Sequence, residues 1–135
     1  MEIFGTARLA EHAEEAKQRW GDTDAWKESQ RRTATYTKDD WLKIKQEADA
    51  SIATFAKLVE RGEPATSEAA MDAAEAYRQH LSHWFYDCGH QQHRALAELY
   101  VSDPRYTATW DETAPGFSHY VHDAIHANAD RAAGR

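Results

Sequence analysis

The spacing of apolar residues in the first half of the chain is the feature that most limits its fold. Between Thr37 and Gly62, apolar side chains recur every three or four positions, at Trp41, Ile44, Ala48, Ile52, Phe55 and Val59. This spacing places them on one face of an α-helix. A threonine followed by acids begins the segment and a glycine ends it, as in a capped helix. Since no segment alternates β-branched and polar residues as a strand would, we predict an all-α fold.

Four more helices are predicted after residue 62 from the same two signals, a capping residue and an apolar stripe. They are expected to begin at Ser67, after a break at Gly89, at Asp103-Pro104, and after Pro115-Gly116. The third of them is short and begins with proline, which is tolerated in a first helical turn. The remaining sequence therefore also predicts a compact helical domain.

Length and composition favour one domain and exclude several kinds of partner. A chain of 135 residues can bury one core. The net charge of −7 argues against direct nucleic-acid binding, because phosphate recognition needs a concentrated basic face. No apolar run reaches the roughly 20 residues that cross a membrane, and the N-terminus does not resemble a signal peptide. The single cysteine excludes an internal disulfide, so we expect a cytoplasmic setting.

The first 36 residues differ from the rest because their helical stripes are very polar. Helices are predicted over about 7–20 and from Asp22 or Thr23 towards Tyr36. Burying so few large apolar groups offsets little of the entropy lost when a backbone is ordered. We therefore divide the chain into an N-terminal lid, 1–36, and a ligand-binding core, 37–135. The lid is expected to attach loosely without ligand and to fold over it, although a simple surface hairpin explains the pattern equally well.

The aromatic residues supply a candidate pocket. The chain has five tryptophans, six tyrosines and four phenylalanines, and most of these rings are expected in the core. Trp84, Phe85 and Tyr86 are consecutive, so one helix cannot bury all three on a single packing face. At least one ring must line a cavity, contact a second element or face water. Such an apolar wall beside a few polar groups is typical of a small-molecule pocket, and a crossing of three helices would also use it.

Cys88 and His93 raise the question of a nucleophile and its base. On one continuous helix they would point about 140° apart, which makes a poor catalytic pair, although a break at Gly89 removes this constraint. A lone cysteine is more often a buried and inert thiol. We therefore expect no catalysis here. His93 shares a face with Leu96 and Tyr100, so it is either a core residue or a ligand contact.

His119, His122 and His126 have the spacing that brings imidazoles to one face of a helix. The same helical wheel places them opposite the apolar stripe of that segment, so we expect them to face solvent. No cysteine or glutamate completes a closed ligand set, and an open row lacks the groups that orient metal-bound histidines. We therefore predict no native metal site and no cofactor.

Several short motifs occur in order along nearly the whole chain. They are Trp20-Gly21-x-Thr23, Thr33-x-x-Tyr36-Thr37-Lys38-x-Asp40-Trp41, Gly62-Glu63-Pro64-Ala65, Met71-Asp72-Ala73-Ala74-Glu75, Tyr86-Asp87-Cys88-Gly89 with His93, Tyr100-Val101-Ser102-Asp103, Pro115-Gly116, and Asp123-Ala124-Ile125 with Ala127-Asn128-Ala129. Together they resemble the TipAS antibiotic-recognition domain family. The resemblance implies a globin-like arrangement of helices without haem. It also implies a cleft for thiopeptides or other large antibiotics.

The resemblance also bears on the wider context of the domain. The family usually follows a MerR-type DNA-binding helix-turn-helix and a dimerising coiled coil, and this sequence contains neither. The chain is therefore expected to be either a free-standing protein that sequesters a drug or the sensor domain of a regulator.

Two departures from the family pattern affect the expected ligand. The resemblance implies that relatives that bind thiopeptides use a cysteine about seven residues beyond the cysteine of Tyr-Asp-Cys-Gly to capture a dehydroalanine of the drug, and Ala95 occupies that position here. Covalent capture is thus in doubt, since only Cys88 could attempt it. Trp84-Phe85, His90 and the histidines at 119, 122 and 126 also differ, which allows another compound class held without a covalent bond.

We predict a non-enzymatic binding module for a large hydrophobic antibiotic. The candidate ligand-binding residues are Tyr36, Trp41, Trp84, Phe85, Tyr86, Asp87, Cys88 and His93, with Trp110 and Phe117 as weaker ones. The alternatives are a globin-like haem or metal protein that uses His93 or the histidine row, and an interaction domain whose aromatic patch contacts another protein.

Overall fold

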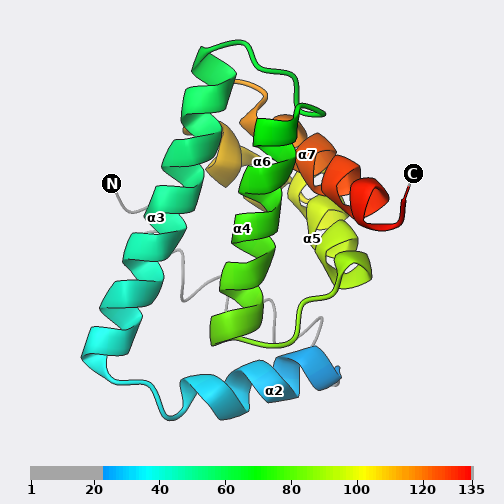
Figure 1. Cartoon of the computed structure of the whole chain (residues 1–135). Coiled ribbons are helices and arrows are strands. Elements are labelled where there is room, and N and C mark those ends of the chain that lie inside the picture. The colour runs from blue at the N-terminus through cyan, green and yellow to red at the C-terminus, as the bar shows by residue number, and fades with distance from the viewer. Residues whose placement is uncertain (1–22, 135) are drawn as a thin grey trace.

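The computed structural model describes residues 23–134, and within that range the chain forms six α-helices and no strand (Figure 1). They are α2 (Asp24–Thr33), α3 (Lys38–Glu60), α4 (Glu68–Trp84), α5 (His90–Ser102), α6 (Pro104–Asp111) and α7 (Phe117–Ala132). The predicted all-α fold is confirmed. The helix expected over about 7–20 lies outside the described residues. None of the described helices is long and apolar enough to cross a membrane.

The helices begin where the capping residues predicted. Thr37 accepts a hydrogen bond from the Asp40 amide, and the Asp40 carboxylate accepts one from the Thr37 amide, which forms a capping box at the start of α3. Thr23 and Asp103 cap α2 and α6 with their side chains, as does Ser67 for α4. These local bonds satisfy amides that a helix cannot pair internally.

Two glycines lie at the predicted ends and breaks. Gly62 follows α3 with a φ of 73°, a left-handed conformation that glycine adopts without a steric penalty. Gly89 caps the start of α5 and thereby separates Cys88 from that helix. The predicted break at this position is confirmed.

The core lies where the five helices α3 to α7 meet. Phe55 of α3, Trp110 of α6 and Phe117 of α7 are at most 1% exposed, and their rings contact one another edge-on or tilted. Helix α4 contributes buried alanines and packs against both α3 and α7, while α7 also packs against α5. Trp110 and Phe117 were weak candidates for ligand binding. The structure places both inside the core, so we leave them out of the candidate site.

Helix α2 lies across the end of the bundle, below the C-terminal end of α4 in the view of Figure 1. None of its described side chains is buried. Arg32 donates to the backbone carbonyl of Ser82 at 2.8 Å and to the Asp87 carboxylate at 3.0 Å. The hydroxyl of Tyr36, just after α2, donates to the carbonyl of Trp84. Hydrogen bonds from Arg32 and Tyr36 therefore connect this segment to the bundle.

Candidate ligand-binding site

Four of the predicted aromatic residues come together where α2, α3 and α4 meet. We call Tyr36, Trp41, Trp84 and Phe85 the aromatic cluster. The ring centroid of Tyr36 lies 5.8 Å from that of Trp41 and 5.5 Å from that of Trp84. The ring centroids of Trp41 and Phe85 lie 6.4 Å apart. Trp41 is 45% exposed and the other three rings are half-buried. The cluster therefore presents aromatic surface to solvent instead of filling the core.

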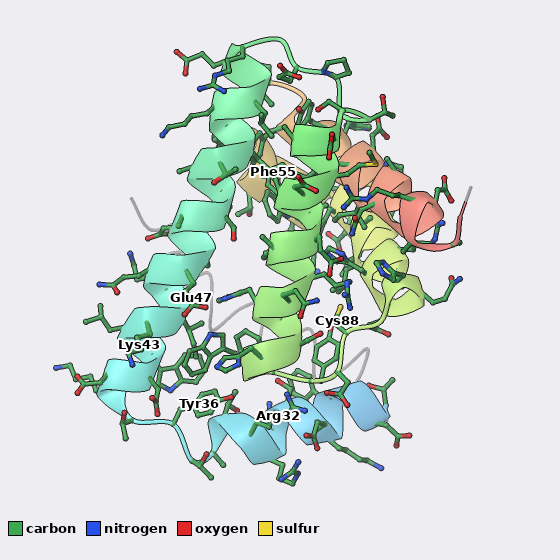
Figure 2. The ribbon with its side chains drawn as sticks, in the orientation of Figure 1. Arg32, Tyr36, Lys43, Glu47, Phe55 and Cys88 are labelled. Carbon is green, nitrogen blue, oxygen red and sulfur yellow. The ribbon has the colours of Figure 1, made fainter. Side chains whose placement is uncertain are left out.

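The cluster forms because three separate segments end at the same place. Trp41 occupies the first turn of α3, Trp84 is the last residue of α4, and Tyr36 lies in the connection between α2 and α3. Figure 2 shows the labelled Tyr36 and Glu47 on either side of the rings between α3 and α4. Helices α3 and α4 pack side by side, so the start of one meets the end of the other.

Glu47 fixes the position of Trp84. Its carboxylate oxygen Oε1 lies 2.8 Å from Nε1 of Trp84, which donates, and 3.0 Å from Nδ1 of His80. The pKa of Glu47 is lowered mainly by the hydrogen bond from Trp84. His80 is buried at 7% exposure beneath the cluster and its ring contacts Phe85. Sequence reasoning missed both residues, since neither belongs to the run of aromatic residues at 84–86 or to a spacing that suggests a site.

A cavity of about 580 Å³ adjoins the connection between α4 and α5. Its described lining consists of Asp24, Lys27, Glu28, Arg31, Tyr86 and Asp87. The first four belong to α2, so this helix forms one wall and the predicted residues Tyr86 and Asp87 form the other. The volume falls within the roughly 300–1,000 Å³ of small-molecule pockets. Most of this lining is charged, which differs from the apolar wall that the sequence predicted.

Cys88 is a buried thiol. The residue is 1% exposed, and its backbone is held by the Ser82 hydroxyl, which accepts from its amide, and by Arg78, which donates to its carbonyl at 2.7 Å. Burial raises the pKa of Cys88 to about 11, so the thiolate that reacts as a nucleophile is scarce at neutral pH. The expectation of a buried, inert thiol agrees with this geometry.

His93 lies deep in the bundle without a hydrogen-bond partner. It is 1% exposed, and neither ring nitrogen is paired within the described part of the chain. Its ring lies 5.8 Å from that of Tyr77, and no bond joins it to Cys88. Burial is the main cause that lowers the pKa of His93 to about 4, so the imidazole is neutral at physiological pH. His93 and Cys88 therefore do not form a catalytic pair in this structure.

Sequence reasoning also missed a charged network behind the connection between α4 and α5. Arg78 donates two hydrogen bonds to Glu75, at 2.9 and 2.6 Å, while Asn128 of α7 donates a third at 3.0 Å. The bonds from Arg78 are the main cause that lowers the pKa of Glu75 to about 2. Since Arg78 also holds the Cys88 carbonyl, the network ties α4, α7 and the α4–α5 connection together.

The histidine row of α7 does not lie wholly in solvent, which corrects the sequence prediction. His119 is exposed, but His122 and His126 are partly buried against α5. There Glu98 lies within hydrogen-bond distance of both rings, at 2.5 and 2.7 Å. The helical wheel correctly placed the row away from the core but could not show that α5 supplies a carboxylate.

Comparison with known proteins finds a protein family that matches most of this chain. The TipAS antibiotic-recognition domain matches residues 12–128. The transcriptional activator TipA of Streptomyces coelicolor is 48% identical over 130 residues, which cover 96% of this chain and 51% of TipA. The transcriptional activator mta of Bacillus subtilis is 30% identical over 115 residues, 84% of this chain and 43% of mta. The chain thus spans about half the length of these relatives.

Solved structures agree with the sequence comparison. The structure of TipAS from Streptomyces lividans in complex with the thiopeptide nosiheptide is 48% identical, with a TM-score of 0.86, and the match covers 97% of this chain and 92% of that one. The antibiotic-binding domain of a TipA-class multidrug-resistance regulator is 49% identical with a TM-score of 0.62, over 66% of this chain and 95% of that one.

Proposed function

Because the chain belongs to the TipAS antibiotic-recognition domain family, we propose that it binds a bulky antibiotic of the thiopeptide kind without transforming it. The observation that carries this proposal is the match, over 97% of the chain, to TipAS in complex with nosiheptide. The haem alternative receives no such support.

The proposed site joins the aromatic cluster to the cavity beside Tyr86 and Asp87. The cluster offers partly exposed rings against which the faces of a large ligand can stack. The charged lining of the cavity offers donors and acceptors that orient it. Helix α2 contributes to both parts, since it ends beside Tyr36 and lines the cavity. A ligand in this site contacts α2 on one side and the α4–α5 connection on the other.

We propose that 23–36 acts as the described part of a lid. The cavity volume of about 580 Å³ is small for a bulky antibiotic, so α2 has to move for such a ligand to enter. Its polar bonds through Arg32 and Tyr36 exchange for bonds to water at little net cost. Burying the aromatic cluster against the ligand then stabilises the closed arrangement.

Binding is proposed to be non-covalent. Cys88 is the only cysteine, and its thiol is buried with a raised pKa. Ala95 stands where thiopeptide-binding relatives have the reactive cysteine. After incubation with nosiheptide, the protein is therefore expected to keep its unmodified mass under denaturing mass spectrometry. A mass increase equal to one drug molecule contradicts this part of the proposal.

In the relatives named as transcriptional activators, the matched part is about half of the protein. We propose that this chain serves as the sensor half of such a regulator, where it shifts the regulator between two states by its different ligand affinity in each. A chain that acts by itself would instead confer resistance by lowering the free drug concentration.

A nosiheptide titration followed by tryptophan fluorescence tests the binding proposal. Tyr36→Leu removes a ring of the cluster, and the expected loss of one aromatic contact, about 1 kcal/mol, weakens binding at least fivefold. Tyr120→Leu is the matched control, because Tyr120 is also half-buried and also donates to a backbone carbonyl, that of Glu63. Equal weakening by both variants, or no saturable signal with the unmodified chain, contradicts the proposed site.

A further inference from the structure

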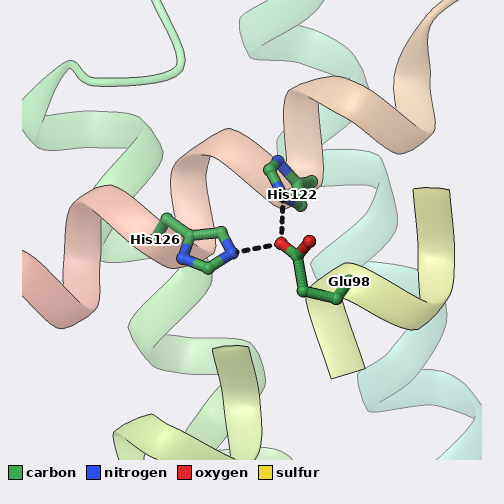
Figure 3. Close-up of side chains that lie close together, drawn as sticks. All are labelled: Glu98, His122 and His126. Atoms are coloured by element: carbon green, nitrogen blue, oxygen red, sulfur yellow. Dashed lines mark hydrogen bonds and ion pairs between the residues drawn. The ribbon is translucent and has the colours of Figure 1, made fainter. Parts of the chain in front are cut away.

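Two histidines of α7 and a glutamate of α5 direct their donor atoms to one point (Figure 3). Nε2 of His122 and Nε2 of His126 lie 2.5 and 2.7 Å from the same oxygen, Oε2 of Glu98. The three donor atoms lie within 4.8 Å of one another. We propose that Glu98, His122 and His126 form a binding site for one divalent transition-metal ion of the zinc class. The site uses none of the residues of the proposed antibiotic site.

The backbone places the ligands correctly for chelation. His122 and His126 are four residues apart on α7, so their rings lie on one face with centroids 4.5 Å apart. Glu98 approaches from α5, which packs along α7. Two imidazoles spaced by four on a helix, completed by a carboxylate from a second helix, suit zinc with one position left for water.

The fit requires only a small adjustment. Ligands bound tetrahedrally at about 2.1 Å from zinc lie roughly 3.4 Å apart, so the carboxylate oxygen must withdraw from each nitrogen by less than about 1 Å. The Glu98 side chain is 61% exposed and can turn, and those of His122 and His126 are 22% and 27% exposed. Imidazole and carboxylate ligands favour zinc, nickel, cobalt and copper over magnesium or calcium.

A neighbouring carboxylate supports one ligand, and an arginine opposes the other. Nδ1 of His122 lies 2.8 Å from Asp123, the kind of carboxylate that orients metal-bound histidines. Nδ1 of His126 lies 2.7 Å from Nη1 of Arg94, which can only donate, so Nε2 of His126 carries the hydrogen. Metal binding requires this hydrogen to move to Nδ1 and Arg94 to turn away, while Arg94 keeps its bond to Asp130. Arg94 therefore lowers the affinity of the site.

The exchange of proton for metal can be balanced. Nε2 of His122 faces Glu98 from α5 and Nδ1 faces Asp123 from α7, so each ring nitrogen has a carboxylate acceptor. Burial lowers the pKa of His122, but the hydrogen bonds to Asp123 and Glu98 outweigh it and raise the value overall. His126, between Glu98 and Arg94, moves one hydrogen between its nitrogens with no net change. Metal binding needs a free electron pair on Nε2, so any proton that Nε2 of His122 holds is released to solvent.

Titration of the tag-free chain with Zn²⁺ by calorimetry tests the proposal, with visible absorption of Co²⁺ as a second readout. We expect one ion per chain and tetrahedral Co²⁺ bands. His122→Gln and His126→Gln are each expected to lower the affinity by more than about 100-fold, since even outer residues of such sites cost 10–100-fold. His119→Gln is the matched control, an exposed histidine of the same helix, and should leave the affinity unchanged.

Two further variants sharpen the test. Asp123→Asn should weaken binding by about 10-fold, and Arg94→Met should strengthen it. Circular dichroism of each variant verifies that the helices remain. The proposal is overturned if Zn²⁺ fails to bind, binds several weak sites, or binds equally well to His122→Gln and His119→Gln. The metal itself is the probe, so these outcomes do not depend on antibiotic binding.

Discussion

Segment 23–36 and the helices α3 to α7 are held by different forces. The α3–α7 bundle encloses Phe55, Trp110 and Phe117, each at most 1% exposed, and its stability therefore comes from apolar burial. In α2 none of the described side chains is buried, and the segment is attached through hydrogen bonds of Arg32 and Tyr36 together with edge-on contacts of the partly exposed Tyr36 ring. The buried apolar contacts of the bundle are lost together when the bundle unfolds. Exposed hydrogen bonds, in contrast, can be replaced individually by hydrogen bonds to water. The two regions should therefore respond differently to the same kind of change.

The largest effect is expected from removing a ring of the bundle. Phe117→Ala should lower the free energy of unfolding by about 4 kcal/mol, because it removes a fully buried ring and leaves a cavity. Urea unfolding followed by circular dichroism measures this loss. A loss below about 1 kcal/mol would show that burial does not dominate the stability of the bundle.

Acid should destabilise the bundle through His93. The pKa of His93 is about 4 in the folded state against 6.5 when unfolded, so the unfolded chain binds a proton that the folded chain excludes. Stability from this source is complete above pH 6.5 and falls by up to about 1.4 kcal/mol per pH unit down to pH 4. His93→Leu should flatten the curve in that window. Urea unfolding at a series of pH values tests this prediction. It is contradicted if the free energy of unfolding of the variant depends on pH as steeply as that of the unmodified chain.

Glu75 should affect the stability of the bundle over a more acidic pH range than His93. Its pKa of about 2 lies below the unfolded value of 4.5, so its stabilising bonds are intact above pH 4.5 and are lost as the pH falls towards 2. At neutral pH, Glu75→Gln should cost about 2 kcal/mol, because it weakens charge-assisted bonds to Arg78. Gln79→Ala is a control, since Gln79 contributes one exposed bond to the same carboxylate. Equal losses in the two variants would argue against the network.

The smallest effect on global stability is expected in α2, where it appears as local opening. Amides of 24–33 should exchange with solvent faster than those of α3 to α7 in the ligand-free chain. Arg32→Met should accelerate their exchange about fivefold, the equivalent of one hydrogen bond of about 1 kcal/mol. Arg31→Met is the control, because the hydrogen bonds of Arg31 stay within α2, to Glu28. Strong protection of α2 without ligand would remove the lid hypothesis and favour a fixed surface helix.

Local signals explain what the sequence could predict. The starts at Thr37, Ser67 and Asp103 depend on a side chain and an amide three or fewer residues away, so the helix boundaries could be read directly. The aromatic cluster was partly predictable, since consecutive rings at 84–86 cannot all be buried by one helix.

Contacts between distant segments could not be predicted in this way. Glu47 lies 37 residues before Trp84, and Glu98 lies 24 residues before His122, so no spacing rule connects them. Only the packing of α3 on α4 and of α5 on α7 brings these groups together. The same reason applies to the charged cavity wall, which depends on where α2 crosses the end of the bundle.

The bonds that α2 makes with the end of α4 have a mechanical consequence. The carbonyls of Ser82 and Trp84 belong to the final turn of α4, where a helix has no amide of its own to pair with them, and Arg32 and Tyr36 supply the donors from about 50 residues earlier in the chain. If α2 moves as the proposed lid, this turn loses the donors that cap its carbonyls, and we expect it to unwind together with the Trp84 ring. In the proposed lid, opening of the entrance and reshaping of its wall would then be a single event, which would couple ligand exchange to the length of α4.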